Sequence, residues 1–175
     1  MKKLSSLIMA TLLFAACENK EAKTTDTVVA ADSTKYPYTI KQVQNWEMNP
    51  DTKNAVTAMT LIKTFESLDT ASMSKVLADS VALDLDGYKF KGTKTQLMKE
   101  LQGEFDKMKG FKIDMQDMES VVNKDKSEEW VSLWYNQVST TKEGKTDTVA
   151  LFNDIKLKNG KVVRLSEYVQ HPMKK

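Results

Sequence analysis

The stretch SVALDLDGYKFKGTKTQLMKELQGEFDKMKG, residues 80–110, decides the fold because its hydrophobic period changes along its length. Apolar and polar residues alternate over residues 81–85 and the chain then turns at Gly87, a pattern typical of a β-hairpin. From Thr93 onward the apolar residues recur at helical spacing, and Thr93 with Gln96 forms a capping box that starts a helix. A hairpin followed directly by a helix predicts a protein of the α+β class.

Two helices are expected before this hairpin and four long strands after the third helix. In residues 49–69, Asn49 suits a helix N-cap and Pro50 suits the first turn, whereas TASMSKVLAD is expected to form a short second helix. Gly110 is expected to end the third helix. The four expected strands are FKIDMQDMESVV, EEWVSLWYNQVSTT, DTVALFNDIKL and KVVRLSEYVQ. Residues 50–172 therefore predict one α+β domain of ordinary size.

The N-terminal residues predict export and a lipid anchor. Two lysines precede an apolar run of about 13 residues, which is long enough for a signal peptide and too short to span a bilayer, which takes about 20. LFAAC, ending at Cys17, resembles the lipobox of bacterial lipoproteins, with Phe14 in place of an aliphatic residue. The resemblance implies cleavage after residues 1–16 and lipidation of Cys17. We expect a protein of the bacterial cell envelope, attached to the outer membrane through this lipid.

The segment that follows Cys17 is polar and small, so residues 17–35 are expected to form the lipidated cysteine and a flexible tether. Tyrosines and Trp46 then appear, and residues 36–49 are expected to be an ordered lead-in packed on the domain. Cys17 is the only cysteine, which excludes a disulfide framework and a cysteine nucleophile in the mature chain.

Charge and composition exclude nucleic acid as a partner. Without residues 1–16 the chain has 24 basic residues (26 less Lys2 and Lys3) and 24 acidic ones. Arg164 is its only arginine, whereas nucleic-acid binding normally uses a basic excess and several arginines. The only histidine, His171, has no second imidazole or cysteine beside it in a metal site and is expected to be exposed. Neither a glycine loop for phosphates nor a nucleophile elbow is present, so no metal and no cofactor are expected.

The order of elements resembles that of the nuclear transport factor 2-like superfamily, which includes the SnoaL-like proteins. The similarity covers residues 50–170 and rests on SLDTASMSKVLADSVAL, YKFKGTKTQL and NGKVVRLSEYVQ. It implies a cone-shaped, curved, mixed or antiparallel sheet packed on three helices, often with an enclosed pocket and frequent dimerisation through the sheet. A homodimer is therefore one expected assembly. The fold serves several enzyme classes and many binding proteins, so it does not by itself define an activity.

Glu167 is the first candidate for a functional residue. In KVVRLSEYVQ it falls in register with Val163, Leu165 and Val169, so a carboxylate is expected to face the apolar interior. Either it is structural, bonded to a partner such as Tyr135, or it acts on a ligand as an acid or a base. The epoxide hydrolases of the superfamily imply an arginine and an aspartate on an earlier strand, and EEWVSLWYNQV contains neither. The ketosteroid isomerases imply a base at the position of Leu85, which is apolar.

The strand EEWVSLWYNQV carries large apolar groups on both of its faces. Tyr135 shares a register with Val131 and Leu133, and Trp130 and Trp134 lie in the opposite register. The tryptophans are expected to be covered by the lead-in or by a second subunit, or to stack on a ligand. Glu167, Tyr135, Trp130 and Trp134 are the candidate ligand-binding residues.

Three functions are consistent with these residues. The first is a lipid-anchored domain that binds a small apolar ligand, or a protein partner, without turnover. The second is an isomerase, lyase or hydrolase that uses Glu167 as acid or base with Tyr135 as an orienting hydroxyl. The third is a structural protein with a filled interior.

Overall fold

The computed structural model describes residues 36–41 and 45–171, which fall into two compact units. Segment 36–41 contains neither helix nor strand, and its expected packing on the domain stays a prediction. The signal peptide, Cys17 and the tether lie outside the described residues. The second unit contains three helices and seven strands among its described residues. In chain order these are β1 (Trp46–Met48), α1 (Lys53–Glu66), α2 (Thr70–Val76), β2 (Leu77–Leu85), β3 (Tyr88–Thr93), α3 (Lys94–Phe105), β4 (Met108–Asn123), β5 (Glu129–Thr141), β6 (Thr146–Lys158) and β7 (Lys161–Gln170).

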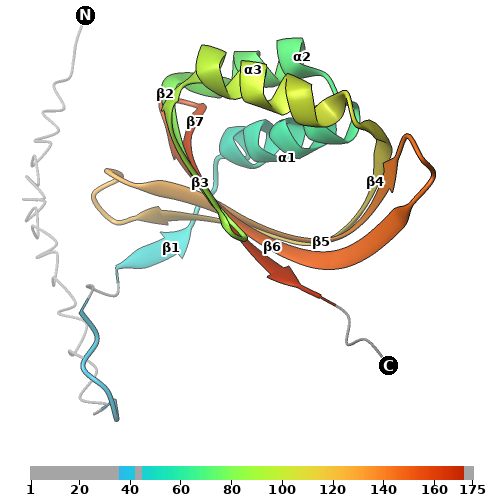
Figure 1. The fold of residues 1–175 in the computed structure, drawn as a ribbon. Coiled ribbons are helices and arrows are strands. Elements are labelled where there is room, and N and C mark those ends of the chain that lie inside the picture. Colours follow the sequence, from blue (N-terminus) through green and yellow to red (C-terminus); the bar gives the residue numbers. More distant parts are fainter. Residues whose placement is uncertain (1–35, 42–44, 172–175) are drawn as a thin grey trace, which may run out of the picture. The chain divides into compact units, whose positions relative to one another are not determined.

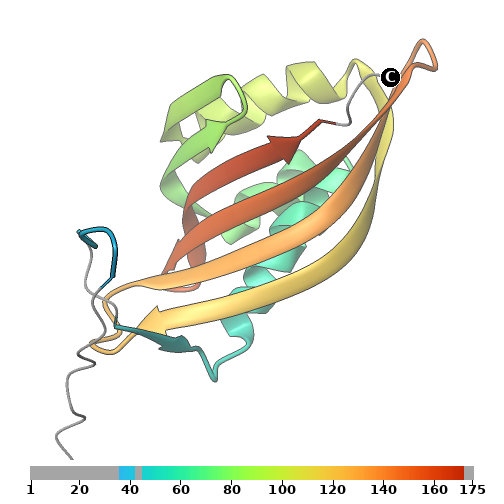
Figure 2. The same cartoon turned by 90° about the horizontal axis from the view of Figure 1, so that it is seen from below.

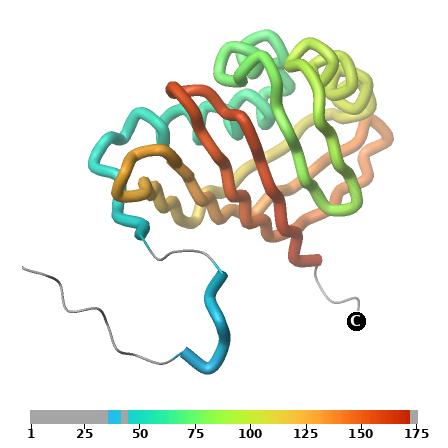
Figure 3. Tube along the Cα trace, turned by 90° about the vertical axis from the view of Figure 1, so that its left-hand side faces the viewer, coloured from blue at the N-terminus to red at the C-terminus, as the bar shows by residue number. Residues whose placement is uncertain are grey.

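The seven strands form one curved sheet in the order β1-β4-β5-β6-β7-β2-β3. Neighbouring strands are antiparallel except β2 and β7, which run parallel. All three helices lie on the concave face (Figure 1), and no helix of the described residues covers the convex face (Figure 2). Figure 3 shows the β2–β3 hairpin beside β7, where Asp84 pairs with Ser166, 82 positions further along the chain. The predicted α+β fold with three helices on a curved sheet is confirmed.

The hydrophobic core fills the space between the concave face and the helices. Alternate residues of the long strands point into it, and α1 contributes the apolar stripe that its spacing predicts. The most deeply buried members include Ala58, Leu61 and Ile62 of α1, Val131 and Leu133 of β5, Ile155 and Leu157 of β6, and Val162 and Leu165 of β7. This core sets the positions of the strands and of the side chains that share its face.

Both ends of α3 can be compared with the sequence pattern. The capping box is confirmed: Thr93 Oγ1 accepts from the Gln96 amide, and Gln96 Oε1 accepts from the Thr93 amide at 2.9 Å. The expected end at Gly110 is wrong, because α3 ends at Phe105 and Gly110 belongs to β4. Phe105 and Phe111 pack against the same ring, Phe65, with centroid distances of 5.4 and 4.5 Å. The chain must turn between them to bring both rings there.

The start of α1 also differs from the expectation. The helix begins at Lys53, and Asn49 is not its cap. Asn49 Oδ1 instead accepts from the Asp51 amide at 3.0 Å, and Asp51 Oδ1 accepts from the Lys53 amide at 2.9 Å. Two successive side-chain turns therefore lead into the helix, and each competes with helical bonding as short polar side chains do.

A register shift in β7 changes the expected inward set. Between Lys156 and Leu157 of β6 the pairing moves from Arg164 to Val162, so Val163 is an extra residue in β7. Val162 is fully buried and takes the core position that the alternation assigned to Val163. Beyond the bulge, the predicted register holds for Leu165, which lies in the core, and for Glu167 and Val169, which are half-buried.

Candidate functional site

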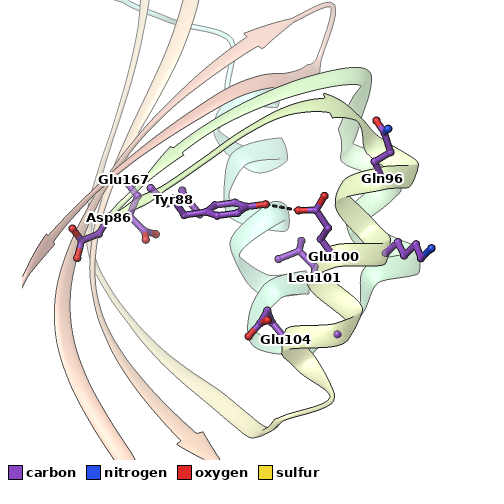
Figure 4. A pocket seen from close by; sticks show the side chains of 10 residues that line it. Asp86, Tyr88, Gln96, Glu100, Leu101, Glu104 and Glu167 are labelled. Carbon is purple, nitrogen blue, oxygen red and sulfur yellow. Dashed lines mark hydrogen bonds between the residues drawn. The ribbon is translucent and has the colours of Figure 1, made fainter.

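A groove of about 930 Å³ opens between α3 and the strands β2, β3 and β7. Figure 4 shows Glu167 and Asp86 on the strand side, Glu100 and Glu104 on α3, and Tyr88 reaching from β3 toward the helix. The lining residues are Leu85, Asp86, Tyr88, Gln96, Lys99, Glu100, Leu101, Gly103, Glu104 and Glu167. A smaller, mainly apolar cavity of about 80 Å³ lies further inside, and Glu167, Leu85 and Leu101 line both spaces.

Glu167 lies where the groove meets the inner cavity. Its neighbour across the sheet is Asn153 of β6. Burial raises the pKa of the Glu167 carboxyl, the nearby charge of Asp86 raises it further, and a hydrogen bond with Asn153 opposes both effects. The carboxyl group therefore holds its proton to higher pH than an exposed glutamate does.

Asn153 is a candidate site residue that the sequence pattern did not single out. It is fully buried, and its Nδ2 donates to the hydroxyl of Tyr135. Its Oδ1 has no hydrogen-bond partner among the described residues. Asn153 alternates with Leu151 and Ile155 in the inward register of β6, so its inward position follows from the same kind of pattern as that of Glu167.

Tyr135 faces the interior and lines the inner cavity together with Glu167. Burial strongly raises the pKa of its phenol, and the charge of Glu167 adds to this, while the hydrogen bond from Asn153 lowers it. Among the described residues, the hydroxyl of Tyr135 is hydrogen-bonded to Asn153 and not to Glu167. Glu167, Asn153 and Tyr135 thus form one buried polar group on three neighbouring strands.

The two tryptophans lie on the other face of β5, away from this group. Lys156 Nζ lies 5.4 Å from the centre of the Trp130 ring, and Trp130 Nε1 donates to Glu128 at 3.4 Å. Trp134 begins an aromatic row that continues through Phe152, at 4.9 Å, to Tyr168, 5.7 Å beyond it. The four candidate ligand-binding residues therefore divide into two pairs on opposite faces of the sheet.

The outer part of the groove is rich in carboxylates. Tyr88 donates to Glu100 at 2.5 Å, and this bond raises the pKa of Tyr88 to about 12. The expected turn at Gly87, with a φ of +71°, places Asp86 at the rim, 3.0 Å from His171 Nε2. His171 is exposed, as its position predicted. The described residues contain no group of three or more histidines, cysteines, aspartates or glutamates that could hold a metal ion.

The substitution Glu167→Gln tests whether ionisation of this buried carboxyl group opposes folding. Since its pKa is raised in the folded state, ionisation of Glu167 opposes folding, and wild-type stability falls as pH rises from about 4.5 through the raised pKa. We expect Glu167→Gln to be more stable than wild type at pH 8 by about 1 kcal/mol, the low end for a buried polar group with incomplete partners. The difference should vanish below pH 4.5, as measured by thermal unfolding at several pH values.

The matched control is Glu143→Gln, which removes the same charge from the exposed turn between β5 and β6. The side chain of Thr141 lowers the pKa of Glu143, so this variant cannot gain stability at pH 8. A Glu167→Gln protein less stable than wild type at pH 8 would show that the carboxylate is well compensated in the fold.

Comparison with known proteins supports the fold at low sequence identity. No family model matches the sequence, and neither does any curated protein. An LEH-like epoxide hydrolase from M. tuberculosis superposes with a TM-score of 0.57 at 10% identity, covering 70% of this chain and 86% of that one. AusH from Aspergillus nidulans superposes with a TM-score of 0.57 at 18% identity, covering 74% of this chain and 90% of that one. An NTF2-like protein of unknown function from Burkholderia pseudomallei superposes with a TM-score of 0.56 at 12% identity, covering 69% of this chain and 92% of that one.

These similarities define the fold as that of the nuclear transport factor 2-like, or SnoaL-like, proteins. At such identities the fold alone is shared, and the activities of the matched proteins do not transfer to this chain. No helix among the described residues is long and apolar enough to cross a membrane.

Proposed function

We propose that this chain is a lipid-anchored protein of the bacterial cell envelope whose SnoaL-like domain binds a small amphipathic molecule without turnover. The observation that carries the proposal is the groove of about 930 Å³ that ends at Glu167. Its volume lies within the range of about 300–1,000 Å³ usual for small-molecule sites. Leu85 and Leu101 supply apolar walls, and the carboxylates supply polar contacts at defined places.

The anchor rests on the sequence of residues 1–17, with two lysines, an apolar run and LFAAC. A lipidated Cys17 followed by a polar tether would hold the domain near the outer membrane and leave it free to meet molecules in the envelope. This placement gives a binding domain access to small molecules that cross or leave the membrane.

The polar group around Glu167 supports binding more strongly than turnover. Acid–base catalysis normally needs a second matched group, and the phenol of Tyr135 is a poor one because burial raises its pKa strongly. The single arginine, Arg164, is exposed on β7 rather than inside the cone. Glu167 therefore has no charged partner of the kind that the epoxide hydrolase resemblance implied.

The alternative is an isomerase, lyase or hydrolase that uses Glu167 as general acid or base. One observation favours it: the pKa of Glu167 is raised by burial, as the pKa of a catalytic carboxyl often is. The two functions differ in what happens to a captured molecule. An enzyme would release a product of changed structure, in wild type and not in Glu167→Gln, whereas a binding protein would leave the molecule unchanged.

Gly103 offers a way to close the groove without disturbing the fold. It lies on α3 and lines the groove, and a Cβ placed on it would meet no atom within 4 Å. We expect Gly103→Phe to fold and to fill the groove with its ring. Native mass spectrometry of the full chain purified from its host should show a small molecule on wild type and its loss from Gly103→Phe.

Gly103→Ala is the matched control, because it adds a side chain too small to block the groove and favours the helix by about 0.5 kcal/mol. It should retain the bound molecule. A wild-type protein that carries no small molecule, or a Gly103→Phe protein that keeps it, would contradict binding in this groove.

A further inference from the structure

The residues that line the groove carry a strong excess of negative charge. Asp86, Glu100, Glu104 and Glu167 come from three different elements, β7, α3 and the turn after β2, and converge on one space. Lys99 is the only cation among the described residues that line it. A ligand of the same sign would meet repulsion here, and a cation would be attracted.

The partners of these carboxylates differ between the rim and the inner end. At the rim, Glu104 pairs with Lys107 at 2.7 Å and Asp86 with His171 at 3.0 Å. Glu100 accepts from the hydroxyl of Tyr88. Glu167 has no ion pair with any cation among the described residues, although it is the most enclosed of the four. At the inner end of the groove, the carboxylate of Glu167 therefore has no positive charge beside it among the described residues.

A second observation at the inner end points to the same chemistry. The Oδ1 atom of Asn153 is buried and has no hydrogen-bond partner within the described chain. Asn153 lies directly across from Glu167 and is bonded to Tyr135, and these two residues line the inner cavity. A buried acceptor without a donor is rare and costly in a folded protein. A buried amide oxygen without a donor thus lies next to a carboxylate that has no cation beside it among the described residues.

The walls beside this place are apolar. Leu85 and Leu101 border both the groove and the inner cavity, and Leu97, Leu165 and Phe65 border the cavity. A molecule seated here would need a group that donates hydrogen bonds, carries positive charge and is attached to a compact apolar part.

We propose that the groove binds a small organic cation, a protonated primary amine with an apolar group, whose ammonium lies at Glu167 and whose apolar part lies between Leu85 and Leu101. This rests on the proposed function and specifies its ligand class. A primary ammonium has three donors, enough for both oxygens of Glu167 and one further acceptor in the groove. The rim carboxylates attract the cation into the groove before it reaches Glu167.

The test uses three probes that share a phenylethyl group and differ in charge: 2-phenylethylamine, 2-phenylethanol and 3-phenylpropanoate. At pH 7.5 the amine is protonated, as a lysine side chain is. Affinities are measured by calorimetric titration of the full chain in detergent, with detergent alone as the blank. We expect the amine to bind at least about tenfold more tightly than either of the other probes, on the scale of one hydrogen bond to a charged group.

Substitutions assign the effect to the site. Glu167→Gln should weaken the affinity for the amine by about tenfold and leave the affinity for the alcohol unchanged. Glu143→Gln should change neither affinity. Equal affinities for amine and alcohol, both abolished by Gly103→Phe, would overturn the amine proposal and leave binding in the groove standing. Tighter binding of the acid, or no binding of any probe, would also overturn it. Binding of some other molecule is then decided separately by native mass spectrometry of wild type and Gly103→Phe.

Discussion

Leu133→Ala is expected to reduce the free energy of unfolding by about 3–4 kcal/mol, a large part of the stability of a domain of this size. Leu133 is among the largest side chains that are fully buried, with an exposed fraction of 0%. It lies in the middle of β5, opposite Met118 on one side and Asn153 on the other. Truncation would remove its contacts and leave a cavity in the buried core.

The strands around Leu133 limit how far this cavity can close. β5 pairs along its whole length with β4 and β6, so its backbone cannot move inward without breaking ladder bonds on both sides. For this reason we place the cost near the middle of the usual range of about 2–5 kcal/mol and not at its lower end. Urea unfolding followed by circular dichroism would measure it, with the slope of the transition unchanged.

Val56→Ala is the control for this substitution. Val56 lies on α1 with 60% of its surface exposed, so its truncation should change stability by no more than about 0.5 kcal/mol. A loss below about 1 kcal/mol for Leu133→Ala would show that β5 does not form the centre of the core.

Cys17→Ser is expected to move the protein from the membrane fraction to the soluble fraction almost completely. Acyl chains on Cys17 would bind the bilayer with about 0.8 kcal/mol per buried methylene, and two or more chains give stable anchoring. A serine side chain has no thiol to lipidate. Fractionation of cells after a high-salt wash would measure the change, and incorporation of a labelled fatty acid would be lost with it.

Ser33→Ala, in the expected tether, is the control and should remain in the membrane fraction. If Cys17→Ser also stayed there after the salt wash, the anchor would not be a lipid on this cysteine. Cys17 lies outside the described residues, so this experiment tests a prediction that rests on sequence alone.

Local patterns allowed most of the fold to be predicted. The change of period near Thr93 predicted the hairpin and α3, and the capping box has the geometry that its spacing implied. Alternation directed Glu167 inward and separated Tyr135 from Trp130 and Trp134, although it did not decide which face of the sheet carries the tryptophans. These features depend on residues close together in the chain, which is why one sequence suffices to find them.

The features that the sequence did not reveal depend on distant partners. The parallel pairing of β2 with β7 is a contact between segments about 80 residues apart. The bulge at Val163 is a shift in the pairing with β6, and the rings on either side of the end of α3, Phe105 and Phe111, both pack on the distant Phe65. The groove itself is the space left between α3 and three strands, and no local period encodes such a space.

The parallel pairing of β2 with β7 also determines when the site can exist. Because β7 is the last of the seven described strands in chain order, Glu167 joins the groove only after the other six strands have been made. Until then β2 lacks its neighbour, and the carboxylates of α3 face an incomplete sheet. Pairing of such distant segments is also slow compared with helix formation. A partly made domain therefore lacks the groove, which is completed only by the last of the described strands.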